Sequence, residues 1–159
     1  VFKELNDTQK DENKNYAVIK GLDFSSDGKS QSIYSPSVEG QIKALRTAYK
    51  NAGINPATVG LIEAHGTGTR VGDKVEFKAL NRIFKESGAN GNKCALGSVK
   101  SMIGHTLGAA SLLEGIAAIK SLQENIAPPT ANYMEPDPDC DLDIIPNKAK
   151  AKNKSLTLQ

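Results

Sequence analysis

Two short apolar runs each lead into a glycine-bearing loop that carries a histidine, and this repeated pattern most constrains the fold. Residues 59–64 run into His65-Gly-Thr-Gly-Thr, and residues 94–100 run into Ser-Met-Ile-Gly-His105. A helical pattern follows each loop. Strands that alternate with helices are typical of an α/β fold with parallel strands. Ligand sites in such sheets lie beyond the C-terminal ends of the strands, so we expect both histidines at the same edge.

The first third of the chain contains three further patterns. Residues 1–15 have almost no apolar content and are predicted to form a solvated loop. Residues 16–24 mix β-branched and aromatic side chains, which predicts a strand. Residues 38–51 place apolar side chains at helical spacing, and Gly53 is the predicted stop of that helix.

The remaining elements are predicted from composition. Residues 73–86 form a second amphipathic helix, and residues 106–123 a helix of mostly small side chains, which we expect to be buried. Residues 142–145 are a predicted strand and residues 147–154 a surface loop. Residues 155–159 begin a further predicted strand, at which the sequence stops.

Composition excludes several classes of protein. The chain has 159 residues, 38% of them hydrophobic, which suits one domain with its own core. With 20 Lys+Arg, 18 Asp+Glu and no Trp, it has no electrostatic or stacking footprint for nucleic acid. No apolar run approaches the roughly 18 residues of a membrane span. Because residues 1–15 are charged and polar, we do not expect them to be a signal peptide. Because the first residue is Val rather than Met, we expect a piece of a longer protein.

The two cysteines, Cys94 and Cys140, are too few for a disulfide scaffold and have no metal-ligand spacing. A reducing, cytoplasmic setting is therefore expected. Metal binding is disfavoured because no Cys, Asp or Glu stands at ligand spacing from either histidine. The loop after His65 also lacks the spacing and the lysine of a phosphate-binding P-loop.

His65 is presented between a strand end and two glycines, beside the hydroxyls of Thr67 and Thr69. Glycine at positions 66 and 68 leaves room for a ligand against the backbone. The alternative is a tight turn whose histidine only satisfies local hydrogen bonds.

His105 precedes a predicted helix and follows Lys100 by five residues. A helix N-terminus favours a neutral imidazole over imidazolium, which suits a hydrogen-bond donor to a developing oxyanion. The alternative is a buried histidine at the helix N-terminus beside a surface lysine. Because the chain's only two histidines both stand in such loops, the pattern favours a site. Oxyanion stabilisation, general acid–base catalysis and activation of a nucleophile all remain open.

A series of motifs resembles the C-terminal half of β-ketoacyl synthases over residues 16–159. In chain order they are E-A-H-G-T-G-T, V-G-D-K-V-E, G-S-V-K-S-M-I-G-H-T with G-A-A-S, and A-P-P-T-A-N. The first and third are similar to polyketide or polyunsaturated-fatty-acid synthase modules, whereas P-D-C-D-L-D around Cys140 is similar to stand-alone fatty-acid enzymes. The subtype stays open.

The resemblance implies that His65 and His105 are the two active-site histidines, which hold the thioester carbonyl of a malonyl group while CO2 leaves and an enolate forms. It implies that Lys100 is the active-site lysine. Thr67 and Thr69 are implied to hydrogen-bond the phosphopantetheine arm of an acyl carrier protein.

Glu114 is implied to support the pocket. The resemblance implies no metal or organic cofactor for the chemistry beyond the phosphopantetheine that the carrier protein brings. Asp73 and Glu76 open a helix, where carboxylates suit the positive end of the helix dipole, so we interpret them as structural.

The family's nucleophilic cysteine lies in its N-terminal half, and neither cysteine here matches it. Cys94 is within a predicted strand, and Cys140 stands among aspartates that disfavour a thiolate. The family's G-F-G-G motif, expected just after Gln159, is also missing. We therefore expect this chain, residues 1–159, to be the C-terminal part of a ketosynthase domain and inactive by itself.

The implied fold is thiolase-like, a duplicated α/β unit in αβαβα layers, of which this chain supplies an incomplete second repeat. The implied parent reaction is decarboxylative Claisen condensation of an acyl thioester with malonyl on an acyl carrier protein. The implied parent is a homodimer that includes the missing N-terminal half. The alternatives are a non-condensing relative, such as a chain-length factor or malonyl decarboxylase, and a non-enzymatic, self-associating fragment.

Overall fold

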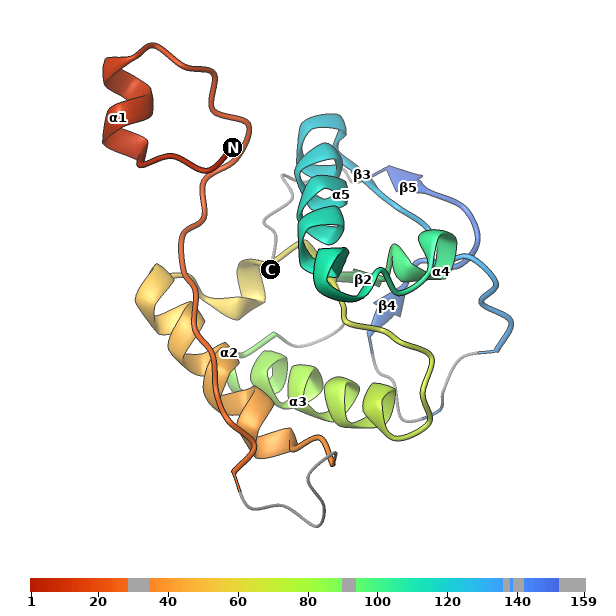
Figure 1. Ribbon diagram of the computed structural model, residues 1–159. Coiled ribbons are helices and arrows are strands. Elements are labelled where there is room, and N and C mark those ends of the chain that lie inside the picture. Colours follow the sequence, from red (N-terminus) through yellow and green to blue (C-terminus); the bar gives the residue numbers. More distant parts are fainter. Residues whose placement is uncertain (29–34, 90–93, 136–137, 139–141, 152–159) are drawn as a thin grey trace.

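In the computed structural model of the chain, three short parallel strands form the centre of the fold (Figure 1). The sheet order is β1 (Leu61–Glu63), β2 (Ala95–Gly97) and β4 (Asp143–Ile144). The predicted parallel sheet is confirmed, and both histidine loops follow neighbouring strands at one edge. The structure describes residues 1–28, 35–89, 94–135, 138 and 142–151.

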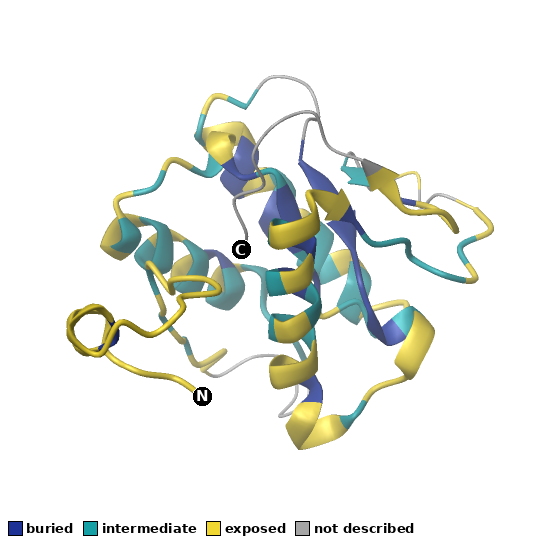
Figure 2. Ribbon diagram, turned by 90° about the horizontal axis from the view of Figure 1, so that it is seen from above, coloured by how far each residue is buried: buried dark blue, intermediate teal, exposed yellow. Residues whose placement is uncertain are grey.

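Both faces of the sheet are covered, which explains why the strand residues of its two core clusters are apolar. Ile62 and Leu96 pair across the sheet and belong to a core cluster with Phe84 of α3 (Gly72–Glu86). Leu61 and Ala95 point to the other face, where Leu122 of α5 (Ala110–Glu124) packs against the cluster that contains them. The result is a helix–sheet–helix arrangement, with α2 (Val38–Ala52) and α3 on one side and α5 on the other (Figure 1). In Figure 2 the buried strands are dark blue, and exposed residues lie on the outer turns of the helices.

The two helices of the first layer form as predicted. α2 (Val38–Ala52) begins at Ser37, whose hydroxyl accepts the Gly40 N–H at 3.2 Å, and it ends at Gly53, which adopts φ +65°. η1 (Pro56–Thr58), a single 3-10 turn, leads to β1. α3 (Gly72–Glu86) packs along α2 through a shared cluster of buried residues: Ile42, Ala79 and Ile83.

The second half of the chain starts with α4 (Lys100–Ile103) and the 3-10 turn η2 (Leu107–Ala109). The predicted small-residue helix follows as α5 (Ala110–Glu124). β3 (Ile126–Ala127) then pairs antiparallel with β5 (Lys150–Ala151).

Within the predicted surface loop over residues 147–154, the described residues 147–150 are exposed, but Lys150–Ala151 form β5. The strand was not predicted, because its pairing with residues 126–127 is non-local and leaves no local signal. Residues 152–154 lie outside the described residues. The predicted strand 142–145 is confirmed as β4. The predicted strand 155–159 and Cys140 lie outside the described residues.

Two predictions for the N-terminal segment are wrong. Part of the predicted loop 1–15 forms α1 (Leu5–Lys10), a short helix held by local bonds such as Thr8 N–H to Glu4 carbonyl at 3.0 Å, which lies apart from the rest in Figure 1. The predicted strand 16–24 is extended chain without a strand partner among the described residues. It touches α2 at Gly21, where an added Cβ would lie 2.4 Å from the Ala48 carbonyl oxygen.

α5 is buried on one face only, which contradicts the expectation that it is buried throughout. Ala110, Ala118 and Ser121 are buried, whereas Leu112 and Ile116 are each 58% exposed. Small residues pack one face closely on the sheet, but nothing in the described chain covers the apolar face opposite. Among the described residues no helix is both long and apolar enough to cross a membrane.

Candidate active site

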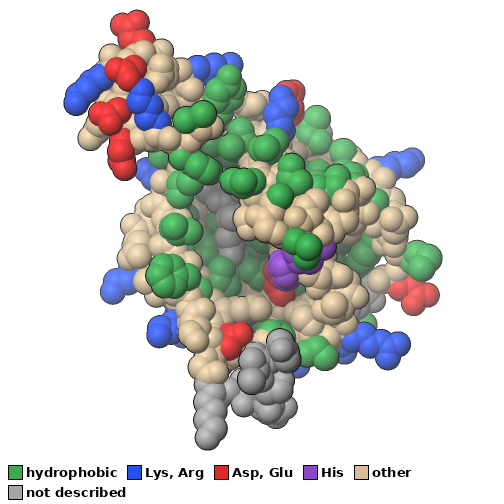
Figure 3. Space-filling view, in the orientation of Figure 1, with side chains coloured by type: hydrophobic (Ala, Val, Ile, Leu, Met, Phe, Trp, Pro, Cys, Tyr) green, Lys and Arg blue, Asp and Glu red, His purple; other side chains and the backbone are tan. Residues whose placement is uncertain are grey.

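The rings of His65 and His105 lie next to each other beyond the C-terminal ends of β1 and β2. Their centroids are 5.4 Å apart and the ring planes meet at 88°, an edge-to-face contact. Both residues are exposed, and their side chains form one patch on the face shown in Figure 3. The parallel sheet brings together two loops that stand 40 positions apart in sequence, because β1 and β2 are neighbours.

A carboxylate from α3 holds the loop that carries His65. Glu76 accepts the His65 N–H through Oε1 at 2.8 Å and the Gly66 N–H through Oε2 at 3.0 Å. The structural role that we predicted for Glu76 at the helix dipole is thus more specific, because its carboxylate binds the backbone of the His65 loop. The sequence signal for this contact was the position of Glu76, 11 residues after His65 and within the first turns of the helix that follows the loop.

A glycine is also required at position 66 because the backbone there packs closely against Ser98, which precedes the second histidine loop. Its φ is +41°, and an added Cβ would lie 2.8 Å from the Ser98 Cβ. Beyond it, the Thr67 and Thr69 hydroxyls lie 3.2 Å apart on the same loop. Thr69 is exposed and Thr67 is half-buried.

His105 has a defined tautomer in its neutral form. Its Nδ1 accepts the Leu107 N–H at 3.2 Å, so the ring proton is on Nε2. Leu107 adopts φ +52° to make this contact. The arrangement leaves the Nε2–H as a donor, which is the form that oxyanion stabilisation needs.

Lys100 and Glu114 form an ion pair in the interior, between α4 and α5. The Lys100 side chain is 4% exposed and that of Glu114 17%. A buried ammonium group requires such a partner, because an unpaired charge there is strongly unfavourable. The alternative interpretation of Lys100 as a surface lysine is therefore wrong, because its side chain is buried.

A further carboxyl group, that of Glu63, lies at the C-terminal end of β1. It is not among the site residues predicted from the sequence. It is the last residue of β1, and its Oε1 accepts the Val99 N–H at 2.6 Å. Burial raises the pKa of Glu63 to about 7, while the Val99 N–H and the Lys100 charge oppose that rise and the Glu76 charge adds to it. The polar neighbours of Glu63 are thus Val99 and Lys100, which lead to the second histidine loop, and Glu76 of α3, which holds the first.

Cys94 immediately precedes β2 and is 3% exposed, within the core cluster beneath the sheet. No group of three or more His, Cys, Asp or Glu in the described ranges could hold a metal ion.

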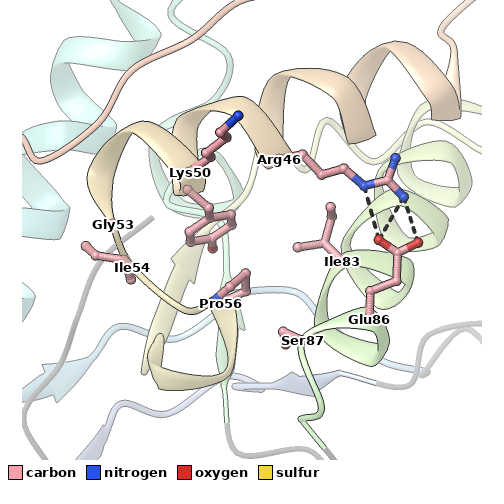
Figure 4. Close-up of a pocket in the computed structure, with 9 residues that line it drawn as sticks. Arg46, Lys50, Gly53, Ile54, Pro56, Ile83, Glu86 and Ser87 are labelled. Carbon is pink, nitrogen blue, oxygen red and sulfur yellow. Dashed lines mark hydrogen bonds and ion pairs between the residues drawn. The ribbon is translucent and has the colours of Figure 1, made fainter.

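A separate pocket of about 340 Å³ lies between the C-terminal ends of α2 and α3 (Figure 4). Arg46 and Glu86 lie together at one side of it, joined by hydrogen bonds of 2.7 Å and 3.1 Å. The pocket contains none of the candidate site residues.

Comparison with known proteins decides the family. The model of the β-ketoacyl synthase C-terminal domain matches residues 16–134. The chain belongs to the β-ketoacyl synthase family. Nodulation protein E from Rhizobium sp. (strain N33) is 46% identical over 142 residues, which is 89% of this chain and 34% of that protein. The chain thus spans about a third of the length of this ketosynthase relative.

Solved ketosynthases share the fold. The ketosynthase from module 6 of the bacillaene synthase from Bacillus subtilis 168 has a TM-score of 0.88 and 33% identity, over 94% of this chain and 28% of that one. A type II polyketide synthase ketosynthase in complex with its acyl carrier protein (AntDE:AntF) has a TM-score of 0.81 and 31% identity, over 94% of this chain and 36% of that one. The thiolase-like α/β fold is confirmed, as a partial domain with a small parallel sheet.

Proposed function

We propose that this chain supplies the two-histidine half of a β-ketoacyl synthase active site, in which His65 and His105 bind one thioester carbonyl oxygen. The observation that carries the proposal is the facing pair of rings, with centroids 5.4 Å apart. The Nε2–H tautomer of His105 supports it, because two N–H donors aimed at one oxygen stabilise the charge that develops there.

The proposed reaction is decarboxylative condensation. The bond from C2 of the malonyl group to its carboxylate breaks, CO2 leaves, and the electron pair becomes an enolate whose oxygen the two histidines hold. The enolate carbon then attacks an acyl thioester, and the thiolate of that thioester leaves. The acyl group stands on a cysteine of the N-terminal half in this proposal, because Cys94 is buried and unsuited to the role.

Lys100 acts through its charge in this proposal, as the cation at the start of the second loop, and its ion pair with Glu114 holds it in place. Thr67 and Thr69 are the proposed contacts of the phosphopantetheine arm. Their paired hydroxyls, close to His65 on one loop, support this assignment. No metal and no organic cofactor of the chain's own takes part.

The proposed partner is an acyl carrier protein that brings malonyl and acyl thioesters, supported by the ketosynthase–carrier protein complex among the solved relatives. The proposed parent is a cytoplasmic homodimer that combines this chain with an N-terminal half. A chain-length factor or a malonyl decarboxylase would share the histidine half. We retain the first as an alternative because one solved relative is a ketosynthase/chain length factor.

The test uses the complete protein that contains this sequence, supplied with malonyl carrier protein. We expect CO2 release in wild type and its loss in His65→Ala and His105→Ala. Lys43→Ala, which changes an exposed residue of α2, is the control. Normal decarboxylation in both histidine variants would refute the assignment. CO2 release without a condensation product would identify the non-condensing alternative.

A further inference from the structure

One carboxyl group connects the two histidine loops directly. Glu63 closes β1 two residues before His65, and its Oε1 accepts the N–H of Val99, which precedes Lys100. The bond joins residues 36 positions apart and lies at the ends of two paired strands. A side chain of the first loop therefore holds the start of the second.

The charged groups around Glu63 come from each element packed at this edge. Lys100 faces it from α4, and Lys100 is itself paired with Glu114 of α5. Glu76 faces it from α3, with both oxygens committed to the first loop's N–H groups. Glu63 and Glu76 also line one cavity of about 240 Å³ between α2, β1 and α3. The second Glu63 oxygen, Oε2, is buried and has no hydrogen-bond partner in the described chain.

We propose that Glu63 is a positioning residue for the reaction, which couples the two histidine loops through the Val99 N–H and so holds Lys100 and His105 in register with His65. The inference rests on the proposed function of the two histidines. Its physical basis is that donors to a developing oxyanion act only when they are held within about half an ångström of the productive geometry.

The bond to Val99 also depends on the charge of Glu63. An ionised carboxylate accepts an N–H more strongly than a protonated one. Because burial raises the pKa of Glu63 to about 7, the carboxyl changes its charge in the neutral range. The link between the loops therefore strengthens as the pH rises through about 7.

The activity test compares Glu63→Ala and Glu63→Gln in the complete ketosynthase with malonyl carrier protein. We expect Glu63→Ala to lower kcat for CO2 release by about tenfold to a hundredfold with KM unchanged, because the donors are misplaced only for the transition state. Glu63→Gln keeps an acceptor oxygen and should retain most of kcat, but without the rise in activity near pH 7. Glu39→Ala, which removes an exposed carboxylate from α2, is the matched control.

A second readout does not depend on activity. In the complete protein labelled with ¹⁵N-valine, the Val99 amide resonance should shift with pH, with a midpoint near 7, in wild type but not in Glu63→Gln. Should Glu63→Ala not fold, this titration and the Glu63→Gln pH profile decide the question.

The outcomes separate the two proposals. Wild-type protein that releases no CO2 refutes the proposed function, and the Val99 titration then still tests the link between the loops. Active wild type with an unchanged kcat in Glu63→Ala, or a Val99 resonance that does not titrate, overturns the inference. A lower melting temperature with unchanged kcat and pH profile would show that Glu63 contributes only to stability.

Discussion

The carboxylate of Glu76 accepts the backbone N–H of His65 at 2.8 Å, and its second oxygen accepts the next N–H along the chain at 3.0 Å. One side chain of α3 thus fixes the backbone from which the first candidate catalytic ring projects. Glu63 and the Lys100–Glu114 pair fix the second loop in a similar way, so three carboxyl groups hold the two histidines.

Replacement of Glu76 should loosen the His65 loop. Glu76→Ala leaves two N–H groups without their acceptor, and we expect it to lower the free energy of unfolding by about 2 kcal/mol and to lower kcat for CO2 release. Urea unfolding and steady-state kinetics of the complete protein measure the two effects. Lys78→Ala, an exposed change on the same helix, should alter neither. An unchanged kcat in Glu76→Ala would argue against this positioning role.

The Lys100–Glu114 pair should be sensitive to loss of one partner. Lys100→Met leaves the Glu114 carboxylate unpaired in the interior, and we expect a loss of about 3 kcal/mol in unfolding free energy. The double variant Lys100→Met/Glu114→Leu should recover much of that loss, because no unpaired charge remains. Lys120→Met, which breaks an exposed pair with Glu124, should cost less than about 1 kcal/mol. A double variant less stable than Lys100→Met would contradict the expectation.

A side chain at position 66 should separate the two loops. Gly66→Ala and Gly68→Ala both place a Cβ at positive φ, which costs about 1–2 kcal/mol each. Only Gly66→Ala also meets the Ser98 Cβ, whereas nothing lies within 4 Å of an added Cβ at Gly68. Gly66→Ala should therefore be the more destabilising, and Ser98→Gly should relieve the difference. Equal unfolding midpoints for the two alanine variants would refute the close approach.

Glu63 should make folding stability depend on pH. Its pKa is raised from 4.5 to about 7 on folding, so the folded state favours the protonated form. The resulting stabilisation is complete below the unfolded pKa of 4.5 and is lost as the pH rises through about 7. The stronger bond from Val99 does not reverse this sign, because burial of the charged form has the larger effect on the pKa.

Thermal unfolding between pH 5 and pH 8 provides the measurement. Glu63→Gln removes the titration, so the difference in unfolding midpoint between Glu63→Gln and wild type should move in favour of the variant as the pH rises. A difference that is constant across this range would exclude a perturbed Glu63.

The outer face of α5 should mediate self-association of this chain when it is made alone. Leu112 and Ile116 are each 58% exposed on that face. We expect sedimentation to detect dimers or larger species, and Leu112→Lys/Ile116→Lys to shift the chain toward monomer. Lys120→Glu, an exposed change of charge on the same helix, should have a smaller effect. A clean monomer of the unmodified chain would contradict this use of the face.

Part of the fold could be predicted because its signals are local. The helix ended by Gly53 and the helix over residues 73–86 have their apolar side chains at helical spacing, and both form. The strands before His65 and Lys100 are short apolar runs, and both are present. The predictions failed where strand pairing is non-local, as in β5, or where an expected strand has no partner within the described part of the chain, as in residues 16–24.

The amino-acid sequence by itself determined the family, the parallel α/β class and the identity of the candidate residues, because ordered motifs and hydrophobic periodicity are properties of the linear chain. Only the tertiary structure decided how those residues meet. The 5.4 Å approach of the two rings, the capture of the His65 N–H by Glu76 and the link from Glu63 to Val99 each join segments that are distant in sequence. Such contacts depend on strand order and helix packing, which bring the carboxyl groups to their N–H partners and bury Lys100 beside Glu114.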